Sequence, residues 1–443
     1  MKGKRALLVN PWIYDFAAYD FWAKPLGLLY LGSILGKNGF RVDLIDLLDV
    51  HHPLLERSNL KRPKRKEDGR GHLFREEVEK PPPLKGIPRR FYRFGMPPDL
   101  FREALCCLPT PDLILVTSGM TYWYLGVRET IKVIKEIFPT VPVFLGGIYA
   151  SLLPDHARRH SGADRVIPGR GEEAMERIIK EVGGDGSPVL SPPDPQDLPY
   201  PAFHLYRKLD YVSILASRGC PFRCPYCASH LLYPGLRRRR PEKVAQEITY
   251  WAEVHGIKDF AFYDDALLFS PDDLFIPLLE ELKDRELEVR FHTPNALHAR
   301  GIDGRVAELM REVGFKTIRI GLETIAPQEK VSAADFRKAV SSLTHAGYSP
   351  EEIGAYILVG LPHQRREEVE DTIKFVWDCG ARPYLAEYSP IPGTDLWEEA
   401  KKASPFPIAE EPLFQNNTLL PCRWEGLSWD DLRELKEMVK TPI

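Results

Sequence analysis

Three cysteines stand close together near the middle of the chain, in the segment SRGCPFRCPYC at residues 217–227. Cys220, Cys224 and Cys227 are separated by three and two residues, so their thiolates can converge on one metal centre. Seven cysteines scattered at random over 443 residues would give such a triplet only about 0.002 times. Two metal centres fit this spacing. One is a structural zinc site closed by His230, and the other is a four-iron cluster with one iron left open for a small chelating ligand.

The elements around these cysteines alternate between strand and helix patterns. An apolar strand at 212–216 precedes the loop, and a helix at 241–255 and a strand at 259–263 follow it. The alternation then continues through further strands at 288–292, 317–320, 352–359 and 384–388, separated by helices at 271–283, 304–313, 333–346 and 367–379. Six such units predict a partial (β/α)6 barrel, with its ligands at the carboxyl ends of the strands.

The first half of the chain repeats the same alternation. Its apolar strands fall at 5–9, 41–48, 112–118, 141–146 and 164–167, with helices at 25–37, 100–108, 125–138 and 172–182. Buried strands joined by helices predict an α/β fold with a doubly wound parallel sheet of the Rossmann type. Ligands of such sheets bind beyond the carboxyl ends of the strands.

Two segments break this pattern and define the predicted domains. Residues 54–99 carry KRPKRKEDGR and PPP, so we expect a polar, solvated insertion, with a lid or a dock for an acidic partner as the alternative. Residues 186–205 are rich in Gly and Pro and predict a linker. The predicted domains are therefore 1–185, 206–392 and a C-terminal extension at 393–443.

Composition excludes several classes of protein. The 60 Lys and Arg nearly balance the 63 Asp and Glu, for a net charge of −3, and 44% of the residues are hydrophobic. A disordered chain and a disulfide miniprotein are excluded, and a nucleic-acid partner is not expected. No apolar run has the length of a membrane span, so we expect a cytoplasmic protein. Cys106, Cys107 and Cys379 are expected to be core thiols.

The cysteine loop, with Tyr226 before the third cysteine, resembles the signature of the radical S-adenosylmethionine (SAM) superfamily. The resemblance implies that Cys220, Cys224 and Cys227 hold a 4Fe-4S cluster whose open iron chelates SAM. One electron from the cluster then splits SAM to methionine and a 5′-deoxyadenosyl radical. It also implies a partial barrel, as the strand count predicts.

Later segments also resemble parts of that family. FAFYDDALLF (260–269), HTPNAL (292–297), IRIGLET (318–324), YILVGLPHQRREEV (356–369) and EYSPIPGT (387–394) resemble its second to sixth strand ends, although His363 stands where the family usually has glycine. A carboxylate is well suited to accept from the methionine amine. The resemblance implies these SAM-binding residues: Tyr226, Asp264, Asp265, Asn295, Glu323, Tyr388 and Ser389.

The first half resembles the cobalamin-binding domain that precedes the barrel in one radical SAM class, through SGMTYWY (118–124), LGGIYASLLPDH (145–156) and VIPGRGEEA (166–174). Glycines at a strand end allow backbone to approach a flat macrocycle. The implied cobalamin-binding residues are Asn10, Pro11, Ser118, Gly119, Thr121, Gly146, Gly147, Gly169, Gly171 and Glu172. NPWIYDF (10–16) lacks the D-x-H-x-x-G motif that supplies a lower axial histidine, and Asp49-Val50-His51 is interpreted as a coincidence.

Together these resemblances imply a cobalamin-dependent radical SAM methyltransferase that acts on an unactivated carbon of a small molecule, peptide or protein. Cyclisation, rearrangement or other radical SAM chemistry without methylation is the alternative, with or without cobalamin. A one-electron reductant of the flavodoxin or ferredoxin type is the implied partner. The four arginines at 237–240 are interpreted as a solvated helix cap, or else as a clamp for an anionic substrate or for the reductant.

Overall fold

The computed structural model describes residues 3–183, 198–325, 331–423 and 426–441. The chain divides into two compact units. Unit 1 comprises Met1–Leu209 with Glu411–Leu413, and unit 2 comprises Asp210–Glu410 with Phe414–Ile443. Most of the predicted linker, residues 186–197, lies outside the described residues.

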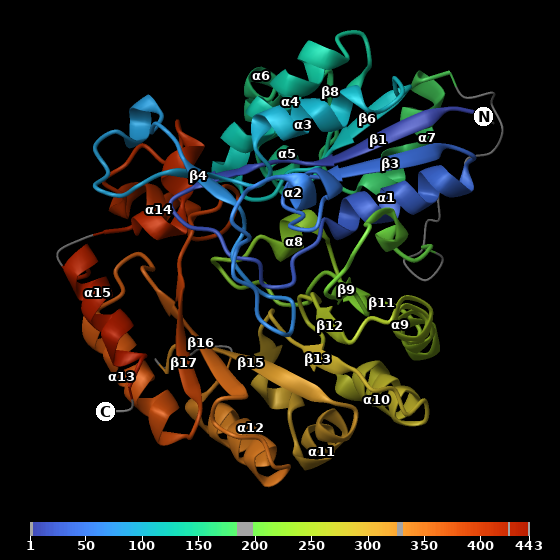
Figure 1. Cartoon of the computed structure of the whole chain (residues 1–443). Coiled ribbons are helices and arrows are strands. Elements are labelled where there is room, and N and C mark those ends of the chain that lie inside the picture. Colours follow the sequence, from blue (N-terminus) through green and yellow to red (C-terminus); the bar gives the residue numbers. More distant parts are fainter. Residues whose placement is uncertain (1–2, 184–197, 326–330, 424–425, 442–443) are drawn as a thin grey trace. The chain divides into compact units, whose positions relative to one another are not determined.

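Unit 1 contains a five-stranded parallel sheet, which confirms the predicted doubly wound fold (Figure 1). Its strands, in spatial order, are β3 (Arg41–Asp46), β1 (Arg5–Asn10), β6 (Leu113–Val116), β7 (Val143–Leu145) and β8 (Arg165–Val166). Helices cover the sheet: α1 (Leu26–Lys37), α3 (Pro98–Cys106), α4 (Tyr124–Ile137), α5 (Ile148–Leu152), α6 (Pro154–His160) and α7 (Gly171–Glu181). The chain order reverses between β1 and β6, and this reversal opens a crevice at the carboxyl ends of those two strands.

The 54–99 insertion is a packed structure, so the expectation of a solvated loop is wrong for most of it. It contains α2 (Pro53–Arg57), β4 (Arg75–Glu77) and β5 (Tyr92–Phe94), and β5 pairs with β4 and with β2 (Ile13–Asp15) in an antiparallel sheet. The buried apolar residues of the insertion are Leu55, Leu73, Phe74, Leu84, Ile87, Phe91, Phe94 and Met96. Overall composition concealed them because charged residues surround each short apolar group.

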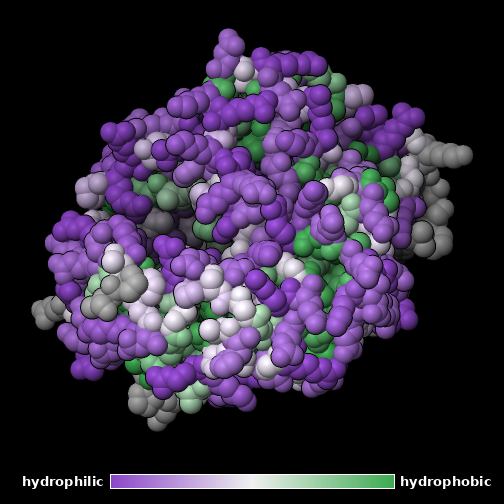
Figure 2. All heavy atoms as spheres, turned by 60° about the horizontal axis from the view of Figure 1, so that its bottom comes forward, coloured by the Kyte–Doolittle hydropathy of each residue, from purple (hydrophilic) through white to green (hydrophobic). Residues whose placement is uncertain are grey.

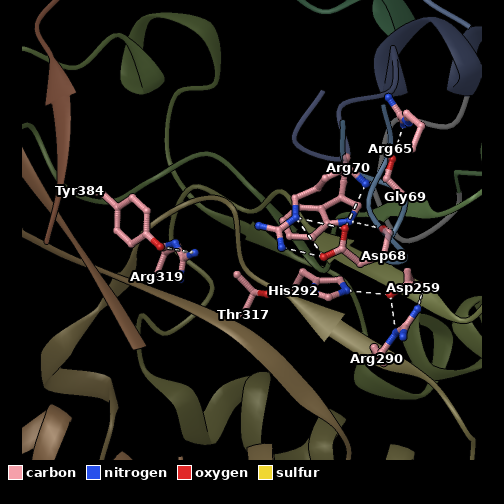
Figure 3. Close-up of polar contacts among 11 residues, drawn as sticks. Arg65, Asp68, Gly69, Arg70, Asp259, Arg290, His292, Thr317, Arg319 and Tyr384 are labelled. Carbon is pink, nitrogen blue, oxygen red and sulfur yellow. Dashed lines mark hydrogen bonds and ion pairs between the residues drawn. The ribbon is translucent and has the colours of Figure 1, made fainter. Parts of the chain in front are cut away.

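Even the basic part of the insertion is fastened to unit 1. The Trp22 indole donates to the carbonyl of Asp68 at 2.7 Å, and the Arg70 guanidinium lies 4.3 Å from the Trp22 ring centre. Arg65 forms an ion pair with Asp20 at 2.6 Å. Figure 3 shows Arg65, Asp68 and Arg70 on this loop. The loop is therefore ordered by contacts that no local pattern in the sequence predicts.

The end of the predicted linker also packs on unit 1. Ala202 and Phe203 are buried, and the Ala202 amide donates to the carbonyl of Leu29 in α1 at 3.1 Å. The Tyr206 hydroxyl donates to Asp46 at 2.6 Å at the end of β3. Residues 198–206 thus belong to the first compact unit.

Unit 2 is an open, parallel, barrel-like sheet surrounded by helices, as predicted (Figure 1). Its path is β9 (Val212–Ile214), β12 (Asp259–Phe262), β13 (Arg290–His292), β15 (Phe315–Glu323), β16 (Ile353–Val359) and β17 (Arg382–Glu387), and the short β14 (Leu297–His298) also pairs with β15. The covering helices are α9 (Pro241–His255), α10 (Phe275–Lys283), α11 (Gly304–Glu312), α12 (Ala333–His345) and α13 (Arg366–Asp378). The sheet does not close, because β9 and β17 are its two edges.

The C-terminal extension contributes α14 (Trp397–Ala403) and α15 (Trp429–Met438). Arg366 of α13 forms an ion pair with Asp431 of α15 at 2.8 Å, and the Trp377 indole donates to the carbonyl of Met438 at 3.2 Å. In the described ranges, every helix is too short or too polar to cross a bilayer. The face drawn in Figure 2 is mostly hydrophilic, with scattered apolar patches.

Candidate functional site

The cysteine loop begins just beyond β9, the first strand of unit 2. A two-stranded antiparallel ribbon encloses it, formed by β10 (Ser217–Arg218) and β11 (Arg237–Arg238), and the loop also contains α8 (Ser229–Leu232). Gly219 has a φ of +79°, and a Cβ there would lie 2.0 Å from the carbonyl oxygen of Gly235. Only glycine fits this position, so the ribbon fixes the chain directly before Cys220.

The three loop cysteines are half-buried and form no disulfide. The Ser229 amide donates to the Cys227 sulfur at 3.5 Å, and the Ser229 hydroxyl oxygen lies 3.4 Å from the same sulfur. Among the residues with described positions, no three His, Cys, Asp or Glu side chains are placed to hold a single metal ion. A four-iron cluster bonds each thiolate to a different iron, so three available thiols on one loop fit a cluster better than a zinc ion.

The structure places the two consecutive aspartates beyond β12 in different environments. Asp264 is buried and accepts from the Ala216 amide at 3.1 Å and from the Ser217 hydroxyl at 2.6 Å, and the Ser217 amide also donates to it. Burial raises the pKa of Asp264 to about 6 despite these bonds. Asp265 is exposed as a whole residue, but desolvation of its carboxyl group by neighbouring residues raises the pKa of that group, and a hydrogen bond with the Ser229 side chain opposes the shift. Asp264 therefore holds the entry to the cysteine loop, whereas Asp265 is open to a ligand.

Tyr226 and Glu323 come together, although they are nearly 100 residues apart in sequence. The Tyr226 hydroxyl is buried and has no hydrogen bond of good geometry in the part of the chain that is described. Burial raises the pKa of this phenol, and the Glu323 carboxylate and Cys224 beside it raise the pKa further. Glu323 ends β15 with a left-handed φ of +69°, a strained conformation that recurs at functional sites. Asn295 lies at the next strand end and donates to the carbonyl of Tyr263 at 2.8 Å.

The last two predicted SAM residues follow β17. Tyr388 is buried, and its hydroxyl has no hydrogen-bond partner in the described chain. Burial, with the Cys422 thiol nearby, raises the pKa of this phenol. The Ser389 hydroxyl donates to the carbonyl of Gln415 at 2.6 Å, so it anchors the C-terminal extension.

A buried polar chain inside unit 2 was missed by the sequence analysis. His292 hydrogen-bonds Asp259 at 3.0 Å through Nε2 and Thr317 at 3.1 Å through Nδ1, and Arg290 also contacts Asp259, at 2.7 Å. Figure 3 shows His292 between these two partners. Asp259 and Arg290 begin β12 and β13, and His292 and Thr317 lie in β13 and β15, so these contacts join three neighbouring strands and stabilise the sheet.

In unit 1 the predicted polar residues Asn10 and Ser118 hydrogen-bond to residues of neighbouring strands and loops. The Asn10 amide group donates to Asp46 at 2.7 Å, which joins the ends of β1 and β3, and Pro11 beside it is buried. The Ser118 hydroxyl donates to the carbonyl of Gly146 at 2.6 Å and accepts from the Ala150 amide at 3.2 Å. Asn10 and Ser118 stand on the two sides of the switch point between β1 and β6.

The two glycines after β7 differ sharply. Gly147 has a φ of +96°, and a Cβ there would lie 2.3 Å from the Ser118 carbonyl oxygen, so the fold itself requires this glycine. A Cβ on Gly146 would meet nothing closer than 3.8 Å, which leaves its backbone open. Two large apolar side chains beside these loops, Met120 and Ile148, are exposed. The carboxyl ends of β6 and β7 thus present open backbone and apolar surface, which suits a flat macrocycle.

The other predicted cobalamin residues lie around the same strand ends. Gly169 has a φ of +79° with open space around it, and Gly171 begins α7 against Leu31. Thr121, Glu172 and Gly119 complete the predicted set; the first two are buried, and a Cβ on Gly119 would lie 2.9 Å from the Trp123 ring.

Asp49 and His51 form a local turn rather than a cobalamin motif. The His51 amide donates to the Asp49 carboxylate at 3.0 Å, a bond that closes the turn after β3.

The expectation of core thiols is wrong for Cys106 and Cys107, which are both exposed. The buried positions of α3 are Phe101, Ala104 and Leu105, so the cysteines fall past its apolar face.

Sequence patterns also missed a cluster in unit 1 that contains two tyrosines. The Tyr149 hydroxyl hydrogen-bonds His156 Nδ1 at 2.7 Å, and the Tyr124 hydroxyl donates to Glu411 at 3.4 Å. Burial lowers the pKa of His156 to about 4, with a smaller effect from His160. Glu411 lies almost 300 residues after Tyr124, so no local signal could have joined them.

Known proteins provide an independent test of the two domain resemblances. Residues 214–376 match the model of the radical SAM superfamily, and residues 97–179 match the model of the B12 binding domain. The first match contains the cysteine loop and strands β12 to β16, and the second contains β6, β7 and β8. Both matches fall on the segments that carried the resemblances.

Named relatives agree with these domains. The chain is 26% identical to an uncharacterised methyltransferase of Pyrococcus horikoshii, over 75% of this chain and 76% of that protein. It is 25% identical to the anaerobic magnesium-protoporphyrin IX monomethyl ester cyclase of Cereibacter sphaeroides, over 66% of this chain and only 53% of the cyclase. The structure of TsrM from Kitasatospora setae, a radical SAM methyltransferase with cobalamin and a [4Fe-4S] cluster bound, shares the fold, with a TM-score of 0.64, 18% identity, and coverage of 92% of this chain and 76% of TsrM.

Proposed function

This chain is a radical SAM protein with a B12-binding domain, and from that premise we propose that it is a cobalamin-dependent methyltransferase acting on an unactivated carbon. The radical SAM domain implies a 4Fe-4S cluster and SAM, and the B12-binding domain implies cobalamin. The observation that carries the proposal is the presence of both domains in one chain, with three thiols free of disulfides after the first strand of unit 2 and open space beside the glycines that follow β7 and β8 of unit 1. When bound, the cluster would supply one electron to SAM and cobalamin would supply the methyl group.

Cys220, Cys224 and Cys227 would hold the cluster. The ribbon and Gly219 fix the loop before the first thiol, and the Ser229 amide already points at the third sulfur. A hydrogen bond from an amide to a sulfur ligand of the cluster stabilises the more negative, reduced state of the cluster. The loop therefore both positions the thiolates and favours reduction of the cluster.

SAM would bind over the strand ends of unit 2. Tyr226 and Glu323 contact each other, and Asp265 contacts the Ser229 side chain, whereas Asp264, Asn295 and Ser389 hydrogen-bond the backbone. We assign Asp265, rather than Asp264, to the methionine amine. Asp264 and Asn295 would then act as positioning residues, and the orphaned Tyr388 hydroxyl would be available to the adenosine half.

Cobalamin would lie along the carboxyl ends of β6 and β7. Open backbone at Gly146 and Gly169 and apolar contact from Met120 and Ile148 suit a flat ring with hydrophobic edges. Burying these side chains would contribute about 25 cal/mol per Å² of covered apolar surface. The His51 backbone amide closes a turn with Asp49, and residues 10–16 lack the D-x-H-x-x-G motif, so we expect no histidine of that motif to replace the lower base.

The test is anaerobic reconstitution with iron, sulfide and hydroxocobalamin, followed by desalting. We expect iron and cobalt to remain bound, with an absorption spectrum that contains both chromophores. Candidate substrates are then incubated with SAM that carries a labelled methyl group. A product heavier by one labelled methyl group, together with 5′-deoxyadenosine, supports the proposal, and iron without cobalt contradicts it.

A second function has one specific observation in its favour, the similarity to a magnesium-protoporphyrin IX monomethyl ester cyclase. A cyclase would consume SAM and form 5′-deoxyadenosine but add no labelled methyl group to its product. The mass of the product therefore separates the two functions in the same reaction.

A further inference from the structure

The four consecutive arginines after the cysteine loop serve two different purposes. Arg239 is buried, forms an ion pair with Glu247 at 2.6 Å and donates to the carbonyl of Leu215 at 2.8 Å. Arg238 donates to a backbone carbonyl at 2.9 Å. These two side chains fasten the ribbon to the barrel, so they are structural.

The other two arginines, Arg237 and Arg240, are exposed, and so is Arg223 inside the cysteine loop. In the part of the chain that the structure describes, none of the three side chains makes a hydrogen bond or an ion pair. Phe222, the neighbour of Arg223, stacks on the His298 ring with 4.9 Å between the ring centres. This contact holds the loop inward and leaves Arg223 on its outer side.

The ribbon adds a further positive charge to this surface. Arg218 stands directly opposite Arg237 in the antiparallel register, two residues before Cys220. Like charges directly opposite each other on two strands are destabilising. Glu242, the acidic residue nearest to Arg240 along the chain, forms no ion pair with it. The side chains of Arg223, Arg237 and Arg240 thus have no acidic partner in the described structure, which is a cost that an acidic partner would remove.

We propose that Arg223, Arg237 and Arg240 form the docking surface for an acidic one-electron donor protein. This inference rests on the proposed function, because it requires a cluster on Cys220, Cys224 and Cys227. In each step the donor loses one electron and the cluster gains it. Electron transfer slows steeply with distance, so the donor must dock close to this loop. Radical SAM enzymes require such a donor, and charged rims mainly accelerate association.

The experiment compares two electron donors with the reconstituted holoenzyme. Reduced flavodoxin is an acidic protein, and reduced methyl viologen is a small cation that needs no docking surface. In the triple variant Arg223→Glu, Arg237→Glu, Arg240→Glu we expect the KM for flavodoxin in 5′-deoxyadenosine formation to rise at least about tenfold at low salt. With methyl viologen the rate should stay within about twofold of wild type. Added salt should weaken flavodoxin turnover of the wild type more than that of the variant.

Lys316→Glu is the matched control, because Lys316 is exposed near the start of β15, at the opposite end of the strands. It should leave both donors unaffected, and the triple variant to lysine should retain most of the flavodoxin rate. An unchanged flavodoxin KM in the triple Glu variant overturns the proposal. Equal losses with both donors also overturn it, because the arginines then serve the fold or an anionic substrate. If wild type forms no 5′-deoxyadenosine with either donor, the proposed function fails, and the docking surface fails with it.

Discussion

The carboxyl ends of the strands present different groups in the two units. Within the described part of unit 2, the buried hydroxyls of Tyr226 and Tyr388 make no hydrogen bond of good geometry, and the three thiols of the cysteine loop form no disulfide. In unit 1, Asn10 and Ser118 use their polar groups in hydrogen bonds to neighbouring strands. What stays open there is the space beside Gly146 and Gly169. A buried polar group without a partner is destabilising until a ligand satisfies it. Unit 2 is thus prepared for a polar ligand held by side chains, and unit 1 for a flat ligand held by shape.

The largest effect that tests this comparison is expected in the cysteine loop. Cys220→Ala, Cys224→Ala or Cys227→Ala should each remove most of the bound iron and lower 5′-deoxyadenosine formation at least about 100-fold, because each thiolate holds a different iron. Cobalamin retained after desalting should be unchanged, since its predicted residues lie in unit 1. Iron and cobalt assays on the same sample measure both. Cys106→Ala, at an exposed site on α3, is the control. Normal turnover in any loop variant would refute the cluster assignment.

Variants of two adjacent glycines in unit 1 distinguish an effect on ligand binding from an effect on stability. Gly147→Ala places a Cβ against the Ser118 carbonyl in a conformation of φ +96°, so we expect a loss of stability of about 3 kcal/mol or more. Gly146→Ala has room for its methyl group in the ligand-free protein, so its melting temperature should match wild type. The same methyl group should obstruct the macrocycle and raise the Kd for hydroxocobalamin about tenfold, or about 1.4 kcal/mol. Thermal unfolding and equilibrium binding measure the two effects. An unchanged affinity of Gly146→Ala for hydroxocobalamin would mean that cobalamin does not bind beside Gly146.

The buried carboxyl of Asp264 should make unit 2 sensitive to pH. Its pKa is raised to about 6, so the folded protein binds this proton more tightly than the unfolded chain does. The contribution of this group to stability is therefore greatest at low pH and declines as the pH rises from about 4 to about 6. Relative to Asp264→Asn, the free energy of unfolding of wild type should fall by about 2 kcal/mol between pH 4 and pH 7. Calorimetry of both proteins at several pH values measures the difference, and a difference that does not change with pH would contradict the assignment.

Local patterns predicted most of the fold because its strands are buried on both faces. The apolar run 353–359 and the strand at 5–9, for example, were located almost to the residue, and both are buried strands in the structure. The packed insertion was not predicted, because Leu73 and Phe94 share a small core with Ile13 that forms only when the antiparallel sheet between charged segments pairs.

Within the site, sequence located the segments but not the role of each side chain. Nothing in Asp264-Asp265 indicates which carboxylate binds Ser217 and which is open. Likewise the strained φ of Glu323 and its contact with Tyr226 depend on how β15 ends next to the cysteine loop. Such pairs are set by tertiary packing, and a single sequence does not contain that information in a local form.

The smallest predicted effect concerns one oxygen atom, that of Tyr226. Tyr226→Phe removes a buried hydroxyl whose contacts with Glu323 and Cys224 form no hydrogen bond of good geometry in the described structure, so without ligands the variant should be as stable as wild type or more stable by about 1 kcal/mol. With the cluster and SAM bound, the hydroxyl should gain a partner, and its loss should raise the KM for SAM about three- to tenfold with little change in kcat. Thermal unfolding without ligands measures the change in stability, and SAM titration of the reconstituted enzyme measures the change in the KM for SAM. Ser389→Ala is a useful contrast, because that hydroxyl already donates to Gln415, and the variant should lose stability without ligands. If Tyr226→Phe instead destabilises the ligand-free protein and leaves the KM unchanged, the hydroxyl is structural, and the contrast between a side-chain site in unit 2 and a shape site in unit 1 would lose its clearest support.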